Sequence, residues 1–164
     1  MGRQLPIQLT GDIQMSNYAT DSDILEYEPT IKEFDIIDFS TYHEKTTADI
    51  QRLLRIEWWP RVSRASTTSR YFNSTDIEMD TTKIDTAQFK RAAVYHTLSY
   101  YVLPKLTQHG AEPDRFRMMI DFYKARFREE FDYVLADGVK YDFDGDGTVE
   151  DHEEQPVHFN RLVR

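Results

Sequence analysis

A row of large apolar residues between positions 113 and 138 constrains the fold of this chain more than any other feature. They recur every three or four positions, as Phe116, Met119, Ile120, Tyr123, Phe127, Phe131, Val134 and Leu135. This spacing places them on one face of an α-helix. Pro113 suits the first helical position and Gly138 suits the stop. The sequence therefore predicts a long helix that needs other elements to cover its apolar face.

A second helix is predicted from Tyr42 to about Trp59, where apolar residues again recur at helical spacing. Pro60 is expected to close it, because proline removes a backbone donor and clashes with the preceding turn. Trp58 and Trp59 are adjacent, and neighbouring positions of a helix point in different directions. We therefore expect one of the two tryptophans to lie on the surface.

A third helix is predicted to begin at Asp85, with Gln88 as its capping-box partner. Pro104 stands inside its apolar pattern, so a kink is expected near Tyr100 or Tyr101. A short capped helix is expected within residues 18–27. These features predict a mainly α protein: a small bundle of about four helices, with a long extended loop or β-arm and an extended C-terminal tail.

Changes in composition divide the chain into four parts. They are an N-terminal arm at 1–17, a helical domain at 18–141 that contains an extended loop at 61–84, an acidic loop at 142–154, and a C-terminal tail at 155–164. Within the 61–84 loop, a linker and an assembly arm are the two alternatives.

Composition excludes several classes of protein. The 164 residues include no cysteine, so disulfides and thiolate metal sites are excluded. Neither a signal peptide nor an apolar run long enough to span a membrane is expected. The net charge is -9, and residues 142–154 hold seven acidic residues and no Lys or Arg, which leaves -2 for the remainder. A dedicated nucleic-acid-binding protein would instead show a basic face.

The acidic segment matches the calcium-binding loop D-x-[DN]-x-[DN]-G-x5-E at every specified position. A hard cation such as calcium takes six to eight oxygen ligands. The predicted ligands are the side chains of Asp142, Asp144 and Asp146, the carbonyl of Thr148, Glu150 directly or through water, and Glu153. A solvated turn without an ion is the alternative, and another divalent cation would suit the same ligands.

The surroundings of this loop favour a structural role, in which the loop folds the C-terminal tail back, over the role of a calcium sensor. Sensor loops lie between two helices that open on binding. Pro156 stands three residues after Glu153, so we expect no exit helix. The chain contains no second acidic loop to pair with this one.

An enzyme is the least favoured class. The sequence lacks the G-x-S-x-G, P-loop, H-E-x-x-H and dinucleotide-binding motifs. His96 lies on an apolar helix face, where we interpret it as a core histidine rather than a catalyst.

The tail combines apolar and basic residues after the acidic block. Phe159, Leu162 and Val163, together with Arg161 and Arg164, would suit a peptide that docks into a groove and meets carboxylates there. A frayed terminus is the alternative.

The order of several short stretches resembles the head–tail connector (adaptor) proteins of tailed bacteriophages. Taken in chain order, these stretches are residues 18–25, 47–52, 57–59, 93–95, 103–106, 122–123, 129–131, 138–142 and 161–164. Each stretch alone has low specificity, and their order is more specific. The calcium-type loop is not a general property of such adaptors.

The resemblance implies a structural virion protein that assembles as a ring, usually of twelve subunits, beneath the portal protein. Residues 155–164 would dock on the portal, and residues 61–84 would reach a neck or tail-terminator protein. Viral DNA would pass through the ring without specific binding, and no membrane would be involved. The location would be the neck of the virion, and the host cytoplasm during assembly. Another neck component, such as a stopper or tail terminator, and a calcium-responsive binding module are the alternative functions.

Overall fold

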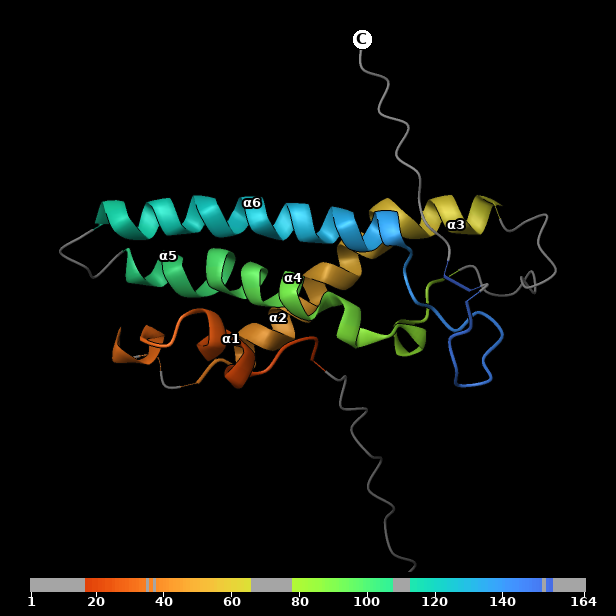
Figure 1. Cartoon of the computed structure of the whole chain (residues 1–164), viewed down its shortest axis with the longest axis horizontal. Coiled ribbons are helices and arrows are strands. Elements are labelled where there is room, and N and C mark those ends of the chain that lie inside the picture. Colours follow the sequence, from red (N-terminus) through yellow and green to blue (C-terminus); the bar gives the residue numbers. More distant parts are fainter. Residues whose placement is uncertain are drawn as a thin grey trace, which may run out of the picture.

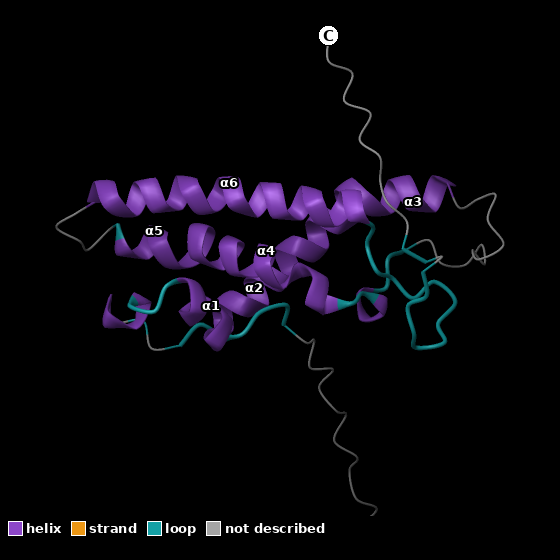
Figure 2. Ribbon diagram, in the orientation of Figure 1, coloured by secondary structure: helices purple, strands orange, loops and turns teal. Residues whose placement is uncertain are grey.

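A computed structural model of the protein describes residues 17–34, 36, 38–65, 78–107, 113–151 and 153–154. These residues are mainly helical, and the helices form four continuous segments packed side by side (Figures 1 and 2). The prediction of a bundle of about four helices is confirmed. Residues 1–16 of the predicted arm, residues 66–77 of the predicted loop and the predicted docking tail at 155–164 lie outside the described residues.

The first helix, α1, is short and runs from Asp21 to Tyr27. Its cap is Thr20, whose backbone N–H donates to the Asp23 carboxylate at 2.8 Å. A carboxylate at this end also interacts favourably with the helix dipole. A 3-10 turn, η1, follows at Ile31–Phe34.

The second segment consists of α2 (Ser40–Leu53), the π-helical turn η2 (Leu54–Trp58) and α3 (Trp59–Ala65). The expectation that Pro60 closes this helix is wrong, because the chain stays helical from Ser40 to Ala65, and the π-helical turn η2 before Pro60 accommodates the proline. The helix therefore continues to Ala65, inside the range predicted as an extended loop. Trp58 and Trp59 are both buried, so the expectation of one surface tryptophan is also wrong.

The third segment begins with the 3-10 turn η5 (Thr86–Phe89), followed by α4 (Lys90–His96), the π-helical turn η6 (Thr97–Val102) and α5 (Leu103–Leu106). The predicted irregularity near Tyr100 or Tyr101 falls within η6. Each π-helical turn ends two residues before a proline, Pro60 or Pro104. A proline ring clashes with the carbonyl four residues earlier, and a wider π-type turn relieves that clash.

The longest helix, α6, runs from Pro113 to Asp137 and lies along α4 and α5 (Figure 1). Its predicted apolar stripe faces the core: Phe131 and Leu135 are fully buried, and Phe127 is 5% exposed. Gly138 ends the helix with a φ of 122°, a conformation that favours glycine. Both predicted ends of this helix are therefore confirmed. No helix among the described residues is long and apolar enough to cross a membrane.

Between the second and third segments lies a short 3-10 turn, η4, at Thr81–Lys83. Ile84 then forms an isolated antiparallel bridge with Tyr141, and the described residues contain no longer strand. The predicted capping box at Asp85 is wrong. Asp85 accepts a hydrogen bond from the N–H of Ala87, whereas the Gln88 side chain turns toward Lys140. Gln88 still donates to the carbonyl of Asp85 at 2.8 Å, but its Oε1 accepts from the N–H of Lys140 and not from that of Asp85, which donates to the carbonyl of Lys140.

Candidate metal centre

The acidic loop leaves the end of α6 and lies beside η4, at the right-hand end of Figure 1. Two backbone hydrogen bonds hold its beginning in place. The N–H of Asp85 donates to the carbonyl of Lys140 at 3.1 Å, and the N–H of Asp142 donates to the carbonyl of Lys83 at 3.0 Å. The loop is therefore tied to a segment almost sixty residues earlier in the chain.

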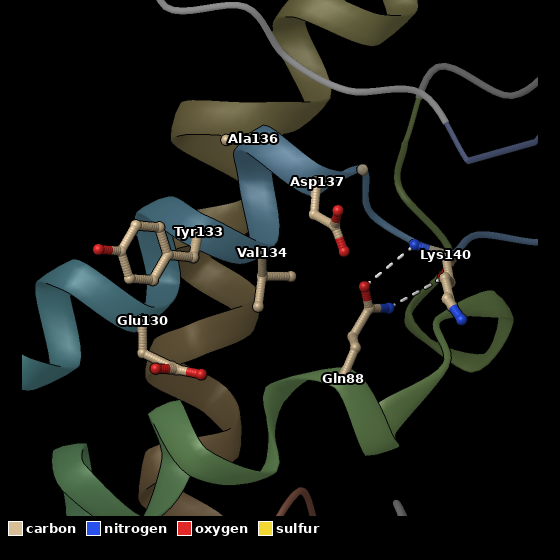
Figure 3. A pocket seen from close by; sticks show the side chains of 8 residues that line it. Gln88, Glu130, Tyr133, Val134, Ala136, Asp137 and Lys140 are labelled. Atoms are coloured by element: carbon tan, nitrogen blue, oxygen red, sulfur yellow. Dashed lines mark hydrogen bonds between the residues drawn. The ribbon is translucent and has the colours of Figure 1, made fainter.

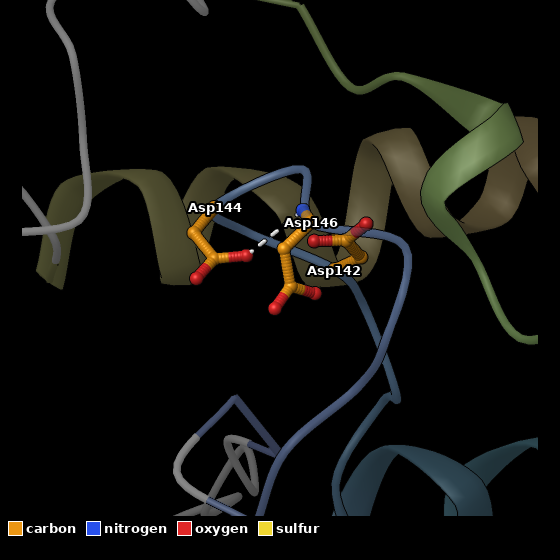
Figure 4. A group of neighbouring side chains, drawn as sticks. All are labelled: Asp142, Asp144 and Asp146. Carbon is orange, nitrogen blue, oxygen red and sulfur yellow. Dashed lines mark hydrogen bonds between the residues drawn. The ribbon is translucent and has the colours of Figure 1, made fainter.

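Three of the predicted ligands come together in this loop. Asp142, Asp144 and Asp146 each offer a carboxylate oxygen, and these oxygens lie within 4.8 Å of one another (Figure 4). Asp142 is only 8% exposed, whereas Asp144 and Asp146 are exposed. Asp144 and Asp146 are therefore open to solvent, whereas Asp142 fixes the group to the protein.

The backbone of the loop orients Asp142. Its two carboxylate oxygens accept hydrogen bonds from the N–H groups of Gly145, at 2.6 Å, and Gly147, at 2.9 Å. Both glycines have positive φ, 78° and 90°, which other residues rarely adopt. The glycines in the motif thus let the chain turn around Asp142.

Asp144 and Asp146 are held by shorter-range contacts. Asp144 Oδ1 accepts from the N–H of Asp146 at 3.1 Å. Asp146 Oδ1 accepts from the N–H of Thr148 at 2.8 Å and from its hydroxyl at 2.7 Å. The hydrogen bond from the Thr148 hydroxyl is the main cause that lowers the pKa of Asp146 below its usual value. Asp146 is therefore ionised at neutral pH, as a metal ligand requires.

Glu153 closes the loop. It is 2% exposed, and its Oε1 accepts from the N–H groups of Phe143, at 2.7 Å, and Asp144, at 3.3 Å. Its Oε2 accepts from the N–H of Glu150 at 3.0 Å. A buried carboxylate is tolerated when hydrogen bonds replace its hydration, as they do here. Glu153 thus joins the two ends of the loop.

The aromatic support beneath the loop was not identified from the sequence. The rings of Trp58 and Tyr141 have centroids 5.6 Å apart, and those of Tyr141 and Phe143 are 4.8 Å apart. Trp59 also lies 5.4 Å from Tyr141. The one sequence signal for this aromatic support was the pair of adjacent tryptophans, because two buried indoles require a large apolar partner.

The three grouped aspartates match the preference of a hard divalent cation for oxygen ligands. Glu150 and Glu153 lie outside this group, and Glu153 is engaged by backbone N–H groups instead. Calcium binding, and the roles of Thr148, Glu150 and Glu153 as ligands, remain predictions.

An open hollow of about 620 Å³ lies next to the loop, at the C-terminal end of α6 (Figure 3). The polar side chains that line it are largely engaged. Gln88 bonds to the backbone of Lys140, Glu130 forms an ion pair with Arg91 at 3.3 Å, and Lys140 forms one with Glu154 at 3.3 Å. These contacts serve to hold the loop and the helices together.

His96 is an interior residue, as predicted, with 4% of its surface exposed. It packs edge-on against Phe127, at a centroid distance of 4.7 Å. Burial, opposed only partly by the nearby Asp49 carboxylate, lowers the pKa of His96 to about 4. This histidine is therefore neutral in the folded protein at neutral pH.

Comparisons with known proteins found no match: no family model, no curated protein and no solved structure is similar to this chain.

Proposed function

We propose that this protein is a head–tail connector (adaptor) of a tailed bacteriophage, which forms a ring beneath the portal and joins the capsid to the neck and tail. One observation carries the proposal. The stretches on which the resemblance rests and that the structure describes, from residues 18–25 to 138–142, are far apart in the sequence and pack into one helical core. They contribute the buried residues Tyr18, Ile50, Trp58, Ala93, Leu103 and Phe131.

The contacts among these stretches are specific. Tyr95 of α4 stacks on Tyr123 of α6 with ring centroids 5.8 Å apart. Trp58, in η2, lies 5.6 Å from Tyr141, which follows α6. The residues that carry the resemblance thus form much of the framework of the fold.

In this proposal the acidic loop orients the C-terminal tail. Its last described residue, Glu154, forms an ion pair with Lys140, so the loop returns the chain to the end of α6. A divalent cation on Asp142, Asp144 and Asp146 would relieve the repulsion among their charges and stiffen the loop. Residues 155–164 would leave from this fixed point and dock on the portal protein.

The proposed partners are the portal protein, a neck or tail-terminator protein, and further copies of this chain in a ring of twelve subunits. DNA would pass through the ring without specific binding, because a net charge of -9 opposes adhesion of the phosphate backbone. The proposed location is the virion neck, and the host cytoplasm during assembly.

The test is co-expression of the full chain with the portal protein of the same phage, followed by purification through a tag on the portal. The chain should co-purify, and electron microscopy should show an added ring. Replacing Phe159, Arg161 and Leu162 by Ala should abolish co-purification, whereas the matched surface variant Ile56→Ala with Arg52→Ala and Arg55→Ala should retain it. Failure of the wild-type chain to co-purify would refute the adaptor proposal.

The alternative functions give different results in the same experiment. A stopper or tail terminator would bind another neck protein and not the portal. A calcium-responsive module would bind neither and would change shape with calcium.

A further inference from the structure

A row of aromatic rings on the surface of the bundle is covered by lysines. The rings of Tyr42 and Tyr101 stack in parallel with centroids 6.2 Å apart. Next to them, His96 contacts Tyr101 at 5.8 Å and stacks on Tyr100 at 4.4 Å. Tyr100 is 47% exposed. The row therefore starts on α2, crosses η6 and opens to solvent.

Each exposed tyrosine face carries an ammonium group. Lys105 Nζ lies 4.6 Å from the ring centre of Tyr42, Lys45 Nζ lies 5.8 Å from that of Tyr101, and Lys124 Nζ lies 5.2 Å from that of Tyr100. The three lysines come from three different helices and are all exposed. We define the lysine–tyrosine patch as Tyr42, Lys45, Tyr100, Tyr101, Lys105 and Lys124.

The positive charge of this patch is only partly offset. Among the described residues, none of the three lysines forms an ion pair with a carboxylate. Asp49 accepts a hydrogen bond from the hydroxyl of Tyr101 and faces His96, and Lys105 donates a hydrogen bond to the hydroxyl of Tyr42. Exposed contacts between a cation and an aromatic ring contribute only about 0.5–1 kcal/mol, so the remaining ammonium protons are available to another partner.

The same chain carries a surface of opposite charge. Seven acidic residues lie within 142–154, and Asp144, Asp146 and Asp151 are exposed. This loop lies at the right-hand end of Figure 1, whereas α5, which carries Lys105, lies toward the left-hand end. The patch and the loop therefore lie toward different ends of the molecule, so in an assembly each would contact a different neighbouring copy.

We propose that the lysine–tyrosine patch of one copy binds the acidic loop of the next copy. The patch and the loop are different surfaces, so the contact is head-to-tail, and such contacts generate closed rings or open filaments. Opposite charges select this pairing and disfavour patch-to-patch and loop-to-loop contacts. The inference deepens the proposed ring assembly, on which it rests, by naming its interface.

Two charge-reversed variants of the full chain test this interface. In the first, Lys45, Lys105 and Lys124 are each replaced by Glu. In the second, the exposed residues Asp144, Asp146, Glu150 and Asp151 are each replaced by Lys, which leaves three acidic residues and four lysines in residues 142–154 and so reverses the sign of the loop. The control carries Arg52→Glu, Arg55→Glu and Arg117→Glu, which change the charge as much as the first variant at exposed positions outside the patch. Native mass spectrometry and light scattering measure the mass at low ionic strength, with a chelator present to exclude effects of bound metal.

The wild type and the control should self-associate, and each charge-reversed variant alone should require at least tenfold higher concentration to do so. Mixed in equal amounts, the two variants should again form oligomers, in which they alternate, because each reversed surface then meets an opposite charge. High salt should weaken all of these assemblies. Three results would overturn the inference: a wild type that stays monomeric, variants that assemble as well as the wild type, or a mixture that stays monomeric.

A further arm uses single-stranded DNA as a probe. If the patch bound this polyanion while the protein remained monomeric, the patch would be a nucleic-acid site and the inference would be wrong. The self-association measurements do not involve the portal protein, so their outcome is independent of portal binding. A chain that assembles through the patch but does not join a portal would refute the adaptor function and leave the interface standing.

Discussion

Gln88 and Lys140 exchange two hydrogen bonds across 52 positions of sequence. The side-chain amide of Gln88 donates to the carbonyl of Lys140 at 3.2 Å, and the N–H of Lys140 donates to Gln88 Oε1 at 3.1 Å (Figure 3). The N–H of Lys140 thus bonds to this side chain, and the carbonyl of Lys140 accepts from both Gln88 and the N–H of Asp85. This contact fixes the direction in which the chain enters the acidic loop.

Replacing Gln88 by Met keeps a side chain of similar length and removes three hydrogen bonds, two with Lys140 and one to the carbonyl of Asp85. The partly buried N–H of Lys140 would lose its partner, whereas the carbonyl of Lys140 would keep the N–H of Asp85, so the free energy of unfolding should fall by about 1–3 kcal/mol. Urea denaturation measures this change. Glu44→Met, at an exposed position of α2, should change it by less than about 0.5 kcal/mol. Equal effects of the two substitutions would contradict the proposed role of Gln88.

The ion pair between Glu57 and Arg128 predicts a dependence of stability on pH. Arg128 donates two hydrogen bonds to Glu57, at 2.8 and 2.7 Å, and they lower the pKa of Glu57 below its ordinary value of 4.5. A lowered carboxyl pKa stabilises the fold above the unfolded-state pKa and ceases to do so as the pH falls through the folded-state pKa. Because both side chains are partly exposed, the contribution should be about 1 kcal/mol or less.

Glu57→Gln should therefore be less stable than the wild type at pH 7, and the difference should shrink as the pH falls below the ordinary glutamate pKa of 4.5 and through the lowered pKa of Glu57. Chemical denaturation at several pH values measures it. Glu44→Gln serves as the matched control, because Glu44 is exposed. A difference between Glu57→Gln and the wild type that is independent of pH would contradict this prediction.

His96 predicts a loss of stability at mildly acidic pH. Its pKa falls from 6.5 to about 4 on folding, so the unfolded chain binds a proton that the folded chain does not. Stability is then complete above about pH 6.5 and declines as the pH falls toward 4, by at most roughly 3 kcal/mol for a shift of this size. His96→Phe removes the titrating group, and its stability should vary less over this range. Parallel pH profiles for the wild type and the variant would show that His96 is not responsible.

Calcium should stabilise the protein through the grouped aspartates. Ligand at one hundred times its dissociation constant stabilises a folded protein by about 2.7 kcal/mol. Asp144→Ala with Asp146→Ala should lose both this stabilisation and the heat of binding measured by calorimetry. The C-terminal segment of this double variant should also become easier to cleave with protease. Asp121→Ala with Asp151→Ala removes the same charge outside the predicted ligand set and should leave binding unchanged. Unaltered calcium binding in the first variant would eliminate the proposed site.

The sequence predicted the part of the candidate site that lies within one short segment of the chain. The spacing of Asp142, Asp144 and Asp146 and the two glycines are properties of one short segment, and the structure brings these aspartates together. The support of the loop was not predictable. Trp58 and Tyr141 lie far apart in the sequence, and no local pattern indicates that their rings meet.

The sequence by itself determined the helical character of this protein, both ends of α6 and the interior position of His96. Local propensities and the spacing of apolar residues decide these features. Only the tertiary structure decided that the second helix continues past Pro60, that both tryptophans are buried, that Gln88 faces Lys140, and that three lysines from three helices cover one row of rings. These features depend on long-range packing, which can outweigh the local preference of a proline or a cap.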